Sequence, residues 1–122
     1  MISYKETDEY KKDFKKLLKR FGTLEDDLET AKTNALELLH EKNIDNRSSV
    51  QITGLNSDKS IYKLRKFACK SLKGSGVMSG IRIIYEFNMA ASEITFIEIY
   101  YKGDKENEDR DRLKNYLDNV QT

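Results

Sequence analysis

The spacing of apolar residues changes once along this chain, from the repeat of a helix to the repeat of a strand. Over residues 8–21 and 24–39, apolar side chains recur every three or four positions, as on one face of a helix. Over residues 61–101 they follow the shorter repeat that is typical of strands. Two helices followed by strands predict an α+β domain, with the helices on one face of a small, mainly antiparallel sheet.

Individual elements follow from the same patterns. A tight turn joins the two predicted helices into a hairpin, and residues 43–49 are predicted to form a loop. Strands are predicted over residues 2–6, 61–69, 80–87 and 93–101, and a final helix is predicted to begin with Asp104 as its cap. Residues 70–79, which include Gly74 and Gly76, are predicted to form a mobile connection. The chain has 122 residues, so residues 1–122 are expected to form a single domain.

Composition excludes several classes of protein. The lone Cys69 cannot form an internal disulfide or a cysteine metal cluster, and it is expected to be a small buried residue. No apolar run reaches membrane-spanning length, and the first residues lack the apolar core of a signal peptide. A soluble, cytoplasmic protein with no metal site and no cofactor is therefore expected.

Charge is spread unevenly, although the net charge is only +1. Residues 58–74 contain six cations and one acid, whereas residues 25–41 contain six acids and one lysine. Opposed regions of this kind are suited to a charged partner. For the acidic region, a solvated helix face is an equally good interpretation.

Three cations are predicted to meet on one face of the sheet. Alternate residues of a strand share a face, so Lys63 and Arg65 project together, and Arg82 can join them from a neighbouring strand. Such cations repel one another unless an anion lies between them. A phosphate backbone or an acidic partner chain would supply that anion.

These strands also resemble a known family. The Tyr-Lys-x-Arg pattern at residues 62–65, the Gly-x-Arg-x-x-Tyr pattern at 80–85, the apolar strand at 94–101 and the terminal helix resemble the RelE/ParE superfamily of bacterial toxins. The resemblance implies an N-terminal helical hairpin packed on a small, mainly antiparallel sheet, with a C-terminal helix. It covers most of the chain.

The resemblance also implies a function. It is that of a toxin of a type II toxin–antitoxin module, a RelE-like endoribonuclease that cleaves mRNA at the ribosome without a metal ion. Lys63 would accept a proton, because a lysine crowded by other cations can act as a base, and Arg65 and Arg82 would bind the phosphate. The expected partners are a cognate antitoxin in a hetero-oligomer, mRNA and the ribosome, with no membrane. Further lysines are candidates for RNA binding: Lys66, Lys70, Lys73, Lys102 and Lys105.

Two other hypotheses stay open. The first is a non-nucleolytic member of the same fold, either a gyrase inhibitor or an inactive antitoxin-binding module. Residues 101–109 favour it, because they are acidic where active relatives carry a further basic residue. The second is an α+β interaction protein unrelated to toxins. The sole histidine, His40, is expected at the surface or at a helix end, and Tyr100, Tyr101 and Tyr116 are candidates for an aromatic role in the site.

Overall fold

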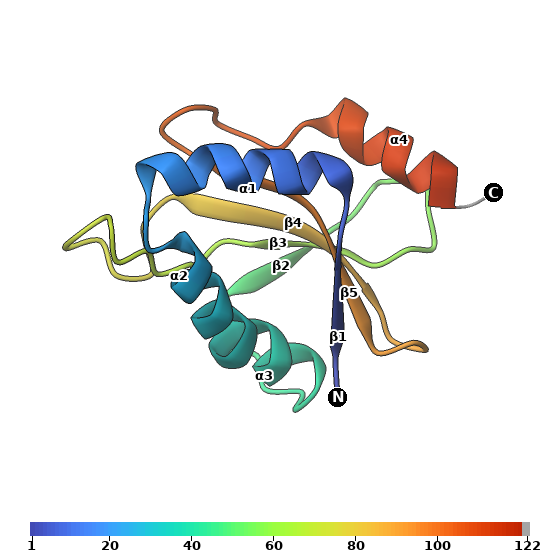
Figure 1. Ribbon diagram of the computed structural model, residues 1–122. Coiled ribbons are helices and arrows are strands. Elements are labelled where there is room, and N and C mark those ends of the chain that lie inside the picture. Colours follow the sequence, from blue (N-terminus) through green and yellow to red (C-terminus); the bar gives the residue numbers. More distant parts are fainter. Residues whose placement is uncertain (121–122) are drawn as a thin grey trace.

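A five-stranded sheet forms the centre of the protein in the computed structural model, which describes residues 1–120. Figure 1 shows α1 and α2 lying across this sheet. The strands are β1 (Ser3–Glu6), β2 (Ser49–Ile52), β3 (Ile61–Leu64), β4 (Ile81–Asn88) and β5 (Glu93–Tyr101). The helices are α1 (Asp8–Arg20), α2 (Leu24–Ala31), a π-helical segment η1 (Lys32–Leu36), α3 (Glu37–His40) and α4 (Arg110–Val120).

The strand order is β1-β5-β4-β3-β2. Strands β2 to β5 pair antiparallel with their neighbours, and only β1 runs parallel to its neighbour, β5. The predicted α+β class with a mainly antiparallel sheet is therefore confirmed. No helix within residues 1–120 is both long enough and apolar enough to cross a lipid bilayer.

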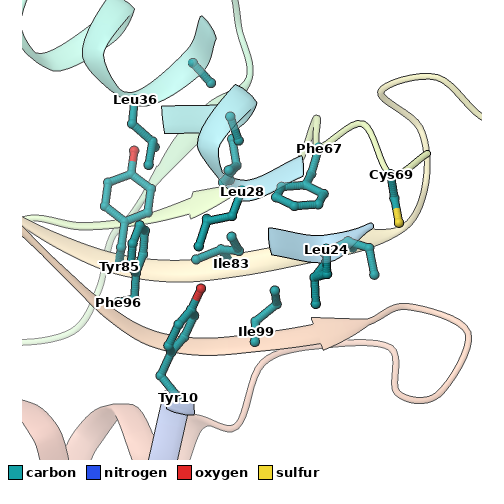
Figure 2. Close-up of a cluster of buried hydrophobic side chains, with 14 of the residues drawn as sticks. Tyr10, Leu24, Leu28, Leu36, Phe67, Cys69, Ile83, Tyr85, Phe96 and Ile99 are labelled. Atoms are coloured by element: carbon teal, nitrogen blue, oxygen red, sulfur yellow. The ribbon is translucent and has the colours of Figure 1, made fainter. Parts of the chain in front are cut away.

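One face of the sheet, which we call the hairpin face, is covered by α1 and α2. Tyr10 of α1 is fully buried and stacks on Phe96 of β5, with ring centroids 5.2 Å apart. Figure 2 shows leucines of α2 and η1 pointing towards Ile83 and Tyr85 of β4. The apolar stripe read from the sequence thus builds this core. Burial of these side chains is the main driving force for the fold.

The other face, which we call the α4 face, is covered by the C-terminal helix. Leu113 and Leu117 of α4 pack with Ile61, Ile84 and Ile97 in a second, separate core cluster. The prediction that all helices lie on one face is therefore wrong. Adjacent residues of a strand point to opposite faces, so the neighbours Ile83 and Ile84 require cover on both.

The strand predicted over residues 61–69 is shorter in the structure, and the connection that follows is bonded to α2 where it begins. Strand β3 ends at Leu64, yet Phe67 and Cys69 still reach the hairpin-face core. The buried Asp27 of α2 accepts the backbone N–H of Lys70 at 3.2 Å. The chain therefore returns to the core without β geometry. The buried position expected for Cys69 is confirmed.

His40 is the last residue of α3, and a helix end was one of the two positions predicted for it. Its ring nevertheless lies against the sheet. Its ring stacks on Phe87, with centroids 4.2 Å apart, and meets Tyr62 edge-on at 4.7 Å. Its Nε2 atom lies 2.7 Å from the hydroxyl of the buried Tyr85. Burial lowers the pKa of His40 to about 4 from its ordinary 6.5.

This lowered pKa predicts a pH dependence of stability. Between pH 6.5 and about 4 the unfolded chain takes up a proton at His40 while the folded chain does not, so stability falls as pH falls. One proton contributes at most about 1.4 kcal/mol per pH unit. Urea unfolding of wild type and His40→Gln at pH 7 and pH 5 is the measurement. The variant should lose less stability than wild type, and an equal loss would contradict the prediction.

Candidate functional site

A groove with a volume of about 390 Å³ opens where β2 begins, β3 ends and β4 begins. It combines four cations with one acid and two exposed apolar side chains. Its lining residues are Asp45, Arg47, Ser49, Val50, Arg65, Lys66, Met78 and Arg82. We call it the cationic groove.

Arg65 and Lys66 line the same groove because β3 ends just before them. Neighbours in a regular strand would point to opposite faces. Here the backbone N–H groups of both residues donate to the carbonyl of Ser48, at 2.7 and 3.2 Å. Arg65 and Lys66 therefore face the single residue Ser48. This is the arrangement of a β-bulge, which changes the direction of the side chains. The sequence expectation placed Arg65 on a longer, regular strand.

Arg82 reaches the groove from β4. Its Nη1 atom donates a hydrogen bond of 2.9 Å to the carbonyl of Arg65, which fixes the guanidinium beside that residue. Gly80 directs the chain into β4 with a φ of 90°, and a Cβ atom there would lie 3.3 Å from the ring of Tyr101. Glycine therefore suits this position, because it adopts a positive φ without strain and has no Cβ atom to crowd the ring of Tyr101.

Arg47 comes from the loop between α3 and β2. Its φ of 64° lies in the left-handed region, which is uncommon for a long side chain. The carboxylate of Asp45 accepts the backbone N–H of Arg47 at 2.7 Å, and Asn46 Oδ1 accepts that of Ser48 at 3.1 Å. These local bonds hold the loop in place, so Arg47 meets the other cations.

The four cations of the groove outnumber its one acid, Asp45. Among the side chains of residues 1–120, no acid forms an ion pair with Arg47, Arg65, Lys66 or Arg82. Arginine presents several donors in a planar fork that matches a phosphate. The groove is therefore arranged to bind a phosphate-bearing ligand.

Lys63 lies outside this groove. It pairs in register with Ile84, on the α4 face, and its Nζ atom lies 2.7 Å from Oε1 of Glu108. The two side chains are 20% and 2% exposed. A carboxylate, rather than a crowd of cations, is therefore the immediate neighbour of Lys63.

Glu108 is held as a carboxylate in this buried setting. Burial alone would raise its pKa, but the contact with Lys63, its own backbone N–H and the charge of Arg110 together lower it. The sequence predicted a final helix with Asp104 as its cap, and such a helix would include Glu108. Instead α4 begins at Arg110, and Glu108 belongs to the segment that crosses the α4 face.

The remaining predicted lysines are dispersed. Lys70 and Lys73 line a different cavity, of about 320 Å³, formed by their own loop. Lys105 pairs with the buried carboxylate of Glu98, and Lys102 is exposed in the turn after β5. Of the eight candidate residues, the structure brings Arg65, Lys66 and Arg82 together.

The three candidate tyrosines serve packing. Tyr100 is 5% exposed, and burial together with Glu108 and Glu98 raises its pKa to about 12. Tyr101 packs edge-on against Phe21, and the Tyr116 hydroxyl donates to Glu86 at 2.6 Å. None of these three side chains lines the cationic groove.

Sequence reasoning missed five residues that line the groove: Asp45, Arg47, Ser49, Val50 and Met78. A short strand over residues 49–52 was the missing element, because Ser-Val-Gln-Ile offers only two apolar residues as a signal. The left-handed backbone conformation at Arg47 could not be predicted from the sequence, because arginine is not a residue type that favours it.

No model of a known protein family, no curated protein and no solved structure matches this chain. The likeness to RelE/ParE toxins, drawn from short strand motifs, stays a prediction. Within the described part of the chain, no three His, Cys, Asp or Glu side chains are grouped so that they could hold a metal ion.

Proposed function

We propose that this protein is a RelE-like toxin of a type II toxin–antitoxin pair that binds mRNA through the cationic groove and cleaves it at the ribosome. The observation that carries the proposal is the meeting of Arg47, Arg65, Lys66 and Arg82 around one groove that contains a single acid. Two of these residues, Arg65 and Arg82, are those to which the family resemblance gives phosphate binding. An antitoxin with an acidic segment would cover the same groove.

The chemistry follows from the groove's charge. Cleavage of RNA through its own 2′-hydroxyl places extra negative charge on the phosphate in the transition state. The guanidinium groups of Arg65 and Arg82 are well suited to stabilise that charge, and that of Arg82 is already oriented by its hydrogen bond to the backbone carbonyl of Arg65. Lys63 is the proton acceptor that the resemblance implies. In the structure Lys63 is paired with Glu108, and a lysine held as an ammonium by a carboxylate cannot accept a proton while that contact persists.

A second candidate is a non-nucleolytic protein of the same fold, a gyrase inhibitor or an inactive antitoxin-binding module. The Lys63–Glu108 pair favours it, because this lysine is already engaged by a buried carboxylate. The position of His40, which packs in the aromatic cluster and does not line the groove, favours it as well. Both candidates keep an acidic antitoxin as the partner.

Induced expression in the absence of an antitoxin separates the two. The nuclease proposal expects growth arrest within one or two generations and cleavage of mRNA mapped by primer extension. Arg82→Ala, made to the same level, should relieve both effects. Growth arrest with intact mRNA and a DNA-damage response would favour a gyrase inhibitor. Harmless expression with intact mRNA would overturn the nuclease proposal.

A further inference from the structure

The outer face of α1 carries a stripe of lysines. Lys11, Lys12, Lys15, Lys16 and Lys19 are all exposed, whereas Tyr10 and Leu17 of the same helix are buried. At about 100° per residue the five lysines cover an arc of roughly 140°, and they extend about 12 Å along the axis. They therefore form one continuous cationic surface, which we call the lysine stripe. None of the groove-lining residues belongs to α1.

The positive charge of the lysine stripe is not compensated by ion pairs within the described part of the chain. Among residues 1–120, no acid forms an ion pair with any of the five lysines. Two of the three acids of α1, Glu9 and Asp13, contact Arg112, and the third, Asp8 in the first turn, forms no ion pair with a side chain of residues 1–120. Like charges three and four residues apart destabilise a helix. An anionic partner would offset that repulsion.

The composition of the stripe identifies the kind of anion. A protein interface is anchored by apolar and aromatic side chains and is depleted in lysine, and an amphipathic helix binds a membrane through exposed apolar residues. The apolar side of α1 is instead packed into the core, and none of the protein's exposed large apolar residues lies on this helix. A positively charged surface without apolar anchors is suited to binding a phosphate backbone.

We infer that the lysine stripe of α1 is a second RNA-binding surface, which docks on the backbone of double-stranded RNA. Single strands are bound by stacking of their bases, for which this convex helix face has no exposed aromatic residue. Duplex RNA is bound by shape and phosphate contacts, which flexible lysines supply. The identity of the polyanion as RNA rests on the proposed function, whereas the cationic surface itself does not.

The test compares two variants with the same change of charge. In the stripe variant Lys12, Lys15 and Lys19 are replaced by Gln. In the control variant Lys42, Lys59 and Lys114, which lie outside α1, are replaced by Gln. Fluorescence anisotropy with a 20-base-pair RNA duplex, between 50 and 200 mM KCl, gives the affinity and its salt dependence. A short single-stranded RNA is the probe for the cationic groove.

The stripe variant should bind the duplex at least tenfold more weakly at 50 mM salt, with a slope of log affinity against log salt that is lower by roughly two. Its single-strand affinity, and that of the control variant for both probes, should change less than threefold. Equal losses in the two variants, or no duplex binding by wild type, would overturn the inference. So would wild-type binding to anionic lipid vesicles in place of the duplex. A wild type that binds duplex through the stripe but leaves mRNA intact in cells would support the inference while the nuclease proposal fails.

Discussion

Replacing Arg65 and Arg82 together with alanine is expected to weaken binding of single-stranded RNA by about 100-fold. Hydrogen bonds to charged groups contribute roughly 1.5–3 kcal/mol each, and the variant removes two guanidinium groups from one groove. Anisotropy with a short labelled RNA at fixed salt is the measurement. The same change should abolish growth arrest if the protein is a nuclease, because the phosphate loses its charge stabilisation.

The matched control for this experiment is the double variant Lys70→Ala/Lys73→Ala. These lysines were candidates for RNA binding from the sequence, but they line a separate cavity in the loop after β3. The control should retain RNA affinity to within about threefold. Thermal unfolding should show that both double variants keep the fold, since exposed cations contribute little to stability. Equal losses of affinity in the two would show that the cationic groove is not the binding site.

Replacing Lys63 with methionine is expected to destabilise the protein by about 2–4 kcal/mol at pH 7. The change leaves the buried carboxylate of Glu108 with Arg110, which is 59% exposed and lies 2.8 Å from its other oxygen, as its remaining ion-pair partner. Removing one partner of a buried ion pair costs several kcal/mol. Urea unfolding measures the loss. The double variant Lys63→Met/Glu108→Leu should recover much of it, because the position of Glu108 then holds no buried charge.

The exposed pair Lys5–Glu93 supplies a control, with Lys5 67% exposed. Lys5→Met should cost less than about 1 kcal/mol. The lowered pKa of Glu108 adds a dependence on pH. Its stabilising effect is present above the ordinary carboxyl pKa of 4.5 and is lost as pH falls through the lower folded value. If Lys63→Met is no more destabilising than Lys5→Met, the pair does not stabilise the fold.

The elements with strong periodicity were predictable from the sequence. The apolar stripe of α1 and the long strands β4 and β5 appear near their predicted positions. Strand β2 was not predicted because it is short and lies at the edge of the sheet, where one side of the backbone needs no partner. The second helical layer had a signal in the apolar run Ile83-Ile84-Tyr85, which requires burial on both faces.

The candidate site was predictable only in part. Strand alternation and antiparallel pairing were enough to bring Arg65 near Arg82. The same reasoning placed Lys63 with them, but Glu108 lies 45 positions further along the chain, and no local pattern links the two residues. Lys66 was expected to bind RNA, and the end of β3 is what turns it into the same groove as Arg65.

The parallel pairing of β1 with β5 has a consequence for how the protein is made. Ser3 lies beside Glu93, so β1 has no neighbouring strand until about 90 further residues have been added to the growing chain. The ring of Tyr10 likewise lacks its stacking partner until Phe96 has been synthesised. Contacts this distant along the chain form late and slowly. A growing chain that has not yet reached β5 therefore holds α1 and β1 without their sheet, and the cationic groove has the complete sheet as its support only after β5 has been made.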